Sequence, residues 1–113
     1  MKNEAKKISK IVDELLTYFL HHYNCSSHVS VIPGTRGYTI TMKFSDVSMT
    51  TNEFEKLKAR LVVRRQPELE DYYWQLAGEV EGSNEMGLVG MMCDSIEIER
   101  DGTAIQLTLL RHG

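Results

Sequence analysis

"IEIERDGTAIQLTL", residues 96–109, consists of two alternating stretches joined by an Asp-Gly pair. Apolar residues alternate with others on both sides of that pair: Ile96 and Ile98 precede it, and Ile105, Leu107 and Leu109 follow it. Alternation with period two is typical of a strand that buries one face. Asp101-Gly102 between two such strands predicts a tight hairpin turn. We therefore expect this end of the chain to form an antiparallel hairpin with one apolar face.

A second alternating stretch, YTITMKF at residues 38–44, follows the turn-like sequence PGTRG. One side of that strand would carry Tyr38, Ile40, Met42 and Phe44. The opposite side would carry Thr39, Thr41 and Lys43. The short sequence HVSVI precedes the turn, so these residues predict a second antiparallel pair that is half exposed to water.

Helical spacing accounts for the apolar residues near the N-terminus and in the middle of the chain. Between residues 4 and 22 one helix would bury Ile8, Ile11, Val12, Leu15, Leu16, Phe19 and Leu20. Thr50 and Glu53 form a capping-box pattern. The helix that follows this pattern would bury Phe54, Leu57 and Leu61.

Two further helices are expected before the C-terminal hairpin. Pro67 is well placed to open one of them, with an apolar face of Leu69, Tyr72, Tyr73 and Leu76. The other would be short and would carry Leu88, Met91 and Met92. The order is then helix, two strands, helices, two strands. We expect one α+β domain spanning residues 1–113, a two-layer sandwich with helices on one face of a mainly antiparallel sheet of four or more strands.

Composition limits the classes of function. The net charge is -3, which does not favour binding to nucleic acid or to an anionic membrane. No apolar run approaches the roughly 20 residues that span a bilayer, and we identify no signal peptide. Cys25 and Cys93 are far apart in sequence, so two free thiols in a reducing compartment are expected. These features predict a cytoplasmic protein.

The element order and several local patterns resemble the GHKL superfamily, the ATP-binding fold of histidine kinases and anti-sigma serine kinases. In that family a helix carries a glutamate and, four residues later, an asparagine that holds magnesium. Glu14 occupies the glutamate position here, but Tyr18 replaces the asparagine. A phenol is a poor ligand for a hard octahedral cation. The resemblance therefore implies that Glu14 is a catalytic remnant.

The family's nucleotide-binding motifs are also partly matched. Asp46 follows a strand at the position of the aspartate that binds adenine, but Ser48 and Thr50 replace two glycines. In the family's glycine-rich lid only Gly87 and Leu88 match, because Glu85 replaces the first glycine and would repel a triphosphate. Gly102 and Thr103 match the family's final Gly-Thr pair.

These replacements imply a degenerate fold that has lost most of its nucleotide and magnesium ligands. The resemblance leaves Asp46, Gly87 and Thr103 as remnants of a nucleotide site, and implies no catalytic residue and no cofactor. We expect a non-catalytic regulatory or protein-interaction module that binds a protein partner or forms a homodimer. The alternative is an ATP-binding protein or weak serine kinase with altered motifs.

Two other residue groups are candidates for binding. His21, His22, Cys25 and His28 are potential zinc ligands, but their spacing matches no known finger, and we expect no metal site. Lys56, Arg60 and Arg64 recur every four residues, and Trp74 follows on the next expected helix. Charged helix residues are typically solvated, whereas arginine and tryptophan are enriched at binding hot spots. We treat these four residues as the candidate partner surface.

Overall fold

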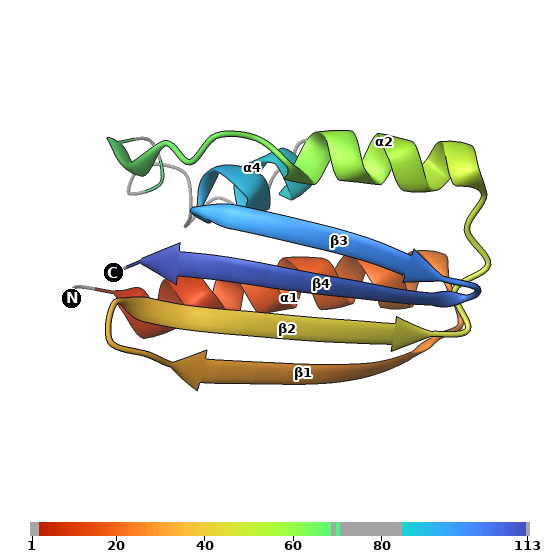
Figure 1. Cartoon of the computed structure of the whole chain (residues 1–113), viewed down its shortest axis with the longest axis horizontal. Helices are drawn as coiled ribbons and strands as arrows, with labels where there is room; N and C mark the ends of the chain where they lie inside the picture. Colours follow the sequence, from red (N-terminus) through yellow and green to blue (C-terminus); the bar gives the residue numbers. More distant parts are fainter. Residues whose placement is uncertain (1–2, 69, 71–84, 113) are drawn as a thin grey trace.

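The computed structural model describes residues 3–68, 70 and 85–112 of the chain. Its elements, in chain order, are α1 (Glu4–His22), β1 (Ser26–Pro33), β2 (Gly37–Ser45), α2 (Thr51–Leu61), α4 (Glu85–Met91), β3 (Ser95–Asp101) and β4 (Ala104–His112). The four strands form one antiparallel sheet in the order β1-β2-β4-β3 (Figure 1). The predicted α+β fold with an antiparallel four-stranded sheet is confirmed.

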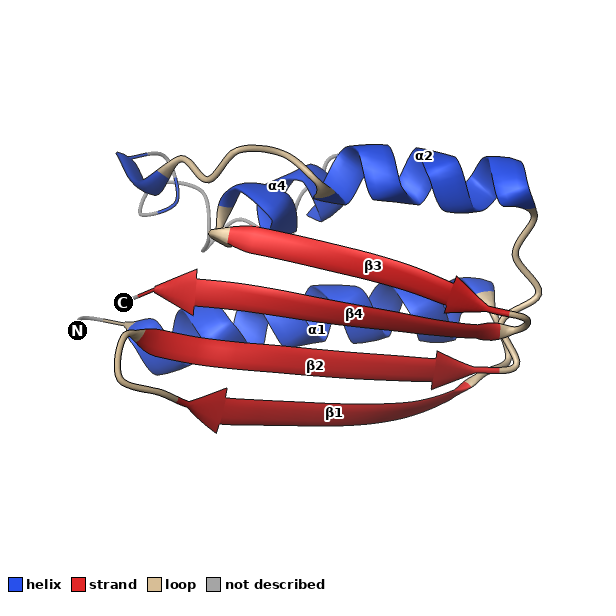
Figure 2. Cartoon of the chain, in the orientation of Figure 1, coloured by secondary structure: helices blue, strands red, loops and turns tan. Residues whose placement is uncertain are grey.

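One face of the sheet carries the core. The buried strand residues alternate as predicted: Ile40, Met42, Phe44, Ile98, Ile105, Leu107 and Leu109. Helix residues complete the same hydrophobic cluster, and Figure 2 shows α1 lying behind the strands. Phe19 of α1 stacks on Phe44 of β2 with ring centroids 3.9 Å apart. In the described residues the buried apolar strand side chains all lie on this one face, so the fold has two layers.

The C-terminal hairpin forms where the sequence predicts it, but the turn lies one residue later. Asp101 pairs with Ala104, so the two loop residues are Gly102 and Thr103. Gly102 has φ +62°, a left-handed conformation that glycine adopts without strain. Glycine at the first loop position is the pattern of a type II′ turn.

Helix α1 has the predicted bounds, but its buried face differs from the prediction in two ways. Leu20 was expected in the core and is instead 53% exposed. Conversely, the charged residues Lys7 and Glu14 are buried beside Ile8, Ile11 and Leu15. The buried face of α1 is therefore rotated toward Lys7 and Glu14, and away from Leu20, relative to the face that apolar spacing predicts.

The middle of the chain follows the capping prediction. The Thr50 side chain accepts a hydrogen bond from the Glu53 N–H at 3.1 Å, and the Glu53 side chain accepts one from the Thr50 N–H at 3.0 Å. Leu57 and Leu61 are buried, whereas Phe54 is only partly buried. Helix α2 ends at Leu61. The apolar face expected on the helix after Pro67 falls on residues 69 and 72–76, which lie outside the described residues.

Helix α4 packs against the end of α2. Met86, Val89 and Met92 are buried, whereas Leu88 and Met91, which were expected on the core face, are only partly covered. Gly90 permits this contact, because a Cβ atom there would lie 2.4 Å from the Leu61 carbonyl oxygen. In the described part of the chain no helix is both long and apolar enough to cross a bilayer.

Candidate functional site

Glu14, the expected catalytic remnant, is buried in the protein. It belongs to α1, and its Oε1 lies 3.9 Å from the Lys10 ammonium. Tyr18, one turn later, is partly buried and packs edge-on against Phe19 at 5.3 Å between centroids. Burial is the main cause that raises the Tyr18 pKa. Glu14 therefore forms part of the packed helix face.

Residues 46–50, which follow β2, connect this strand to α2 through buried side chains and a helix cap. Asp46, Ser48 and Thr50 are exposed, while Val47 and Met49 between them are buried in the core. The Arg100 guanidinium donates a hydrogen bond to the Met49 carbonyl oxygen and holds the segment in place. Thr50 caps α2. The residues at the two expected glycine positions therefore serve a connection between a strand and a helix.

Asp46 and Thr103 come from segments that lie side by side. The Val47 N–H donates to the Thr103 carbonyl oxygen at 2.8 Å, which joins the end of β2 to the β3–β4 turn. Asp46 has φ +66° and, like Thr103, an exposed side chain. The structure thus places next to each other the segments that carry Asp46 and Thr103, two of the expected remnants of a nucleotide site.

Gly87 lies inside α4 and has no close neighbour. A Cβ atom at this position would meet nothing within 4 Å. Packing therefore does not require glycine at position 87, in contrast to position 90 on the same helix.

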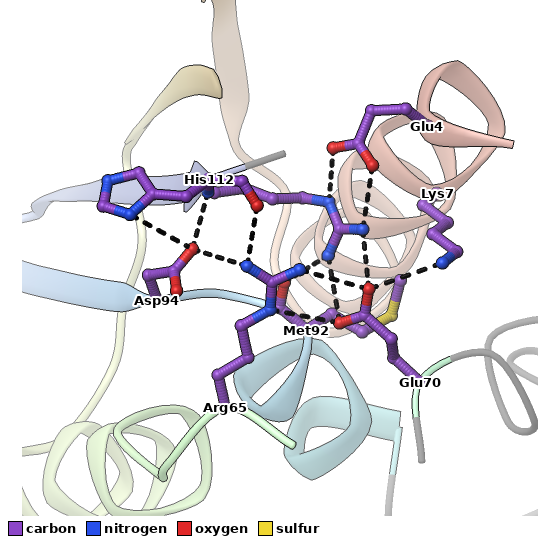
Figure 3. Close-up of polar contacts among 8 residues, drawn as sticks. Glu4, Lys7, Arg65, Glu70, Met92, Asp94 and His112 are labelled. Carbon is purple, nitrogen blue, oxygen red and sulfur yellow. Dashed lines mark hydrogen bonds and ion pairs between the residues drawn. The ribbon is translucent and has the colours of Figure 1, made fainter. Parts of the chain in front are cut away.

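The most prominent polar feature is a buried ion cluster that the sequence did not predict (Figure 3). Its centre is Arg111, whose side chain is 1% exposed. The Arg111 Nη2 and Nη1 atoms donate to the two Glu70 carboxylate oxygens at 2.7 and 3.2 Å. The Arg111 Nε and Nη2 atoms donate to Glu4 at 2.7 and 3.0 Å. Nη1 also donates to the Met92 carbonyl oxygen at 2.6 Å.

A second guanidinium binds the other side of Glu70. Arg65 donates to its carboxylate from Nε at 3.3 Å and from Nη2 at 3.2 Å. Arg65 Nη1 reaches the Asp94 carboxylate at 2.7 Å and the His112 carbonyl oxygen at 2.8 Å. The Lys7 ammonium lies 3.4 Å from Glu70 Oε1. Three cations therefore face three carboxylates, and the formal charges cancel.

The protonation of the cluster follows from these contacts. Burial alone would raise the Glu70 pKa, but the hydrogen bonds and charges of Arg111 and Arg65 outweigh it, so this pKa is lowered. Burial alone would lower the Arg111 pKa, but the hydrogen bonds and charges of Glu70 and Glu4 outweigh burial, so this pKa is raised. In the described residues no buried side-chain nitrogen or oxygen lacks a hydrogen-bond partner. The buried polar side-chain atoms of the cluster are therefore all hydrogen-bonded. The cluster joins the start of α1 to the end of β4, and we call it the clamp.

One sequence signal could have located this clamp. Arg111 continues the alternation of Ile105, Leu107 and Leu109, so period two assigns its side chain to the core. The acidic sequence PELED and the basic residue Arg65 gave no such signal. Nevertheless, Glu70 is 3% exposed, and Arg65 donates to its carboxylate.

A different surface is apolar and uncovered. In the described structure β1 pairs only with β2, and its other edge is free. Four large apolar side chains are exposed on β1 and on α1 beside it: Leu20, Val29, Val31 and Ile32. A groove of about 560 Å³ lies beside β1, and its apolar lining comes from Ile8, Val12, Leu16, Val31 and Tyr38. We call this free strand edge, with the four side chains and the groove, the β1 edge surface.

The ladder shows which backbone groups face the free edge. The Gly34 N–H donates to the Gly37 carbonyl oxygen at 2.7 Å beyond the last β1–β2 pair. Because antiparallel pairs alternate, the even-numbered residues of β1 direct their N–H and C=O groups at β2. Ser27, Val29 and Val31 therefore direct theirs outward. Pro33 has the same phase, and its missing N–H also falls at the edge, where proline is tolerated.

The remaining sequence candidates are dispersed or incomplete. Lys56, Arg60 and Arg64 are exposed; Lys56 and Arg60 lie on α2, and Arg64 lies beyond its end. Trp74 lies outside the described residues. Within the described chain no three His, Cys, Asp or Glu side chains are placed to hold a metal ion. Cys25 and Cys93 are free thiols, and burial raises the Cys93 pKa to about 12.

Comparison with known proteins adds no assignment. No protein-family model matches the chain, and no curated protein matches it.

Proposed function

We propose that this chain is a non-catalytic protein-interaction module that binds its partner through the β1 edge surface. The observation that carries the proposal is the free edge of β1, with outward backbone groups at Val29 and Val31 and exposed apolar side chains on both sheet faces. An open strand edge is a template for pairing with another strand. The adjoining groove offers apolar area next to that template.

Several local features support a non-catalytic role on a degenerate GHKL-like fold. Glu14 is packed inside the protein beside Lys10, and Thr50 serves as a helix cap. Gly87 makes no close contact that glycine alone would allow. The order of elements is the one that raised the resemblance. The two free cysteines suit a reducing compartment such as the cytoplasm.

The alternative function is residual ATP binding. The observation that favours it is the hydrogen bond from Val47 to Thr103, which keeps Asp46 and Thr103 on neighbouring segments. A thermal-shift experiment described in the Discussion separates the two functions.

Site-specific photo-crosslinking tests the proposed surface. A photoreactive amino acid at Val31, in the protein expressed in its native cells, should give a discrete covalent adduct on irradiation. The same residue at Val62 is the control, because Val62 is also exposed but lies at the end of α2. Identical adducts at both positions, or no adduct at position 31, would contradict the proposal.

A further inference from the structure

We propose that the occupant of the β1 edge surface is a second copy of this chain, bound by antiparallel pairing of β1 with β1. This proposal rests on the function proposed above and names its partner. The resulting dimer would contain one continuous eight-stranded sheet, because each copy contributes four strands with β1 at the free edge.

Symmetry is the first reason for a second copy. Two identical strands that pair antiparallel are related by a two-fold axis, so each edge satisfies the other with the same groups. Ser27, Val29 and Val31 all direct N–H and C=O groups outward, and all three have the same phase. If odd-numbered residues of one β1 pair with odd-numbered residues of the other, the outward N–H and C=O groups of the two strands face each other and can form hydrogen bonds.

Charge is the second reason. Charged residues make up 26% of the chain, yet β1 contains only serine, valine, isoleucine, proline and one histidine. Lysine, inward-pointing charges and proline protect strand edges against self-pairing; β1 has no lysine, aspartate, glutamate or arginine, and its one proline, Pro33, is its last residue. Because the whole chain has a net charge of -3, two copies repel least where they approach through an uncharged strand.

Apolar burial is the third reason. Val29 and Val31 point to the helical side of the sheet, in phase with Ile40 and Met42 on β2, but are each 41% exposed. Across the two-fold axis these valines would form one apolar cluster between the two grooves. Leu20 lies one turn beyond Leu16 on the same face of α1 and would extend this cluster. Their exposure in the monomer then has a physical explanation.

Sedimentation velocity of the purified full chain tests the proposal directly. The chain has a mass of 12.9 kDa, and we expect a species of twice this mass at micromolar concentration. Val31→Lys should raise the dissociation constant at least tenfold, because it places two like charges close to the two-fold axis. Val62→Lys is the matched control and should remain dimeric, since Val62 is also exposed and lies at the end of α2.

Residue-resolved amide exchange gives a second measurement that needs no variant. In a β1-paired dimer the amides of Val29 and Val31 should be protected at high protein concentration and should exchange on dilution. The amides of Ser30 and Ile32 point at β2 and should be protected at both concentrations. This measurement decides the question if circular dichroism shows that Val31→Lys does not fold.

The proposal would be overturned by a monomer at about 100 µM, by a dimer that folded Val31→Lys leaves unaffected, or by fast exchange of the Val29 and Val31 amides in a concentrated sample. A crosslink from position 31 to a different protein, with a monomeric purified chain, would overturn the second copy but support the interaction surface. A purified dimer that gives no crosslink at position 31 would contradict both.

Discussion

Arg111 shows how a single residue can organise a small fold. Its position on β4 belongs to the core, and a charge there is tolerated only because two carboxylates and a carbonyl oxygen surround it. Glu70 is the shared acceptor, since Arg111, Arg65 and Lys7 all approach it. Removing Glu70 would leave three buried or partly buried cations against two carboxylates.

We therefore expect Glu70→Gln to lower the free energy of unfolding by about 3–5 kcal/mol. The folded pKa of Glu70 lies below its ordinary value of 4.5. The stabilisation is therefore complete above that pH and is lost as the pH falls through the folded value. Urea unfolding between pH 3 and 7 should show a flatter acid limb in the variant. Glu55→Gln on exposed α2 is the control, and an acid limb as steep in Glu70→Gln as in the parent would contradict the role of Glu70.

Two glycines on α4 give opposite predictions for the same substitution. Gly90→Ala forces a Cβ atom within 2.4 Å of the Leu61 carbonyl oxygen, so α4 or α2 must move, with a loss of about 1–3 kcal/mol. Gly87→Ala meets nothing and should stabilise the helix by up to about 1 kcal/mol. Thermal unfolding of both variants checks this. Destabilisation by Gly87→Ala would indicate a backbone requirement that the structure does not contain.

At the scale of elements, the connection from β2 to α2 combines core packing with helix capping. Val47 and Met49 enter the core, and Thr50 then begins α2 with a reciprocal hydrogen-bond pair. The hydrogen bond from the Thr50 N–H is the largest cause that lowers the Glu53 pKa. The capping hydrogen bond therefore favours the ionised form of the Glu53 carboxylate, which lies at the positive end of the helix.

Thr50→Ala should reduce the free energy of unfolding by about 1 kcal/mol, the usual value for the loss of a threonine cap. Chemical denaturation followed by circular dichroism measures this effect. Ser48→Ala is a matched control in the same segment, because its side chain is exposed and forms no cap. Equal losses in the two variants would mean that the segment, and not the cap, responds to substitution.

The elements that the sequence predicts well are those in which one short-range pattern is sufficient. The alternation in β2 and β4 and the capping box before α2 place their elements within a residue or two. The errors occur where tertiary contacts override the local pattern. Leu20 fits the apolar spacing of α1 but is 53% exposed, whereas the adjacent Phe19 is buried against Phe44 of β2. Glu70 and Arg65 lie in charged stretches of sequence, and distant partners bind them: Arg111 is 41 residues from Glu70, and Asp94 is 29 residues from Arg65.

At the scale of the whole molecule, the same distinction applies to the candidate site. The β1 edge surface depends on strand order, and sequence order alone does not show that β4 pairs with β2 and leaves β1 at an edge. The clamp depends on the meeting of the start of α1 with the end of β4, which Figure 1 shows near the same end of the sheet. The resemblance assigned roles to Asp46 and Gly87 but gave no information on their surroundings, which only the structure describes.

The proposed module should not bind nucleotide, and this can be measured on the whole protein. We expect no thermal stabilisation by millimolar Mg-ATP, because Glu14 is packed against Lys10 and, under the proposed GHKL resemblance, Tyr18 stands where a magnesium ligand would be needed. A ligand present at 100 times its dissociation constant stabilises by about 2.7 kcal/mol, which is several degrees for a chain of this size. Magnesium without nucleotide is the blank. A reproducible shift of several degrees that disappears in Asp46→Ala, whose side chain is exposed and outside the core, would establish ATP binding instead.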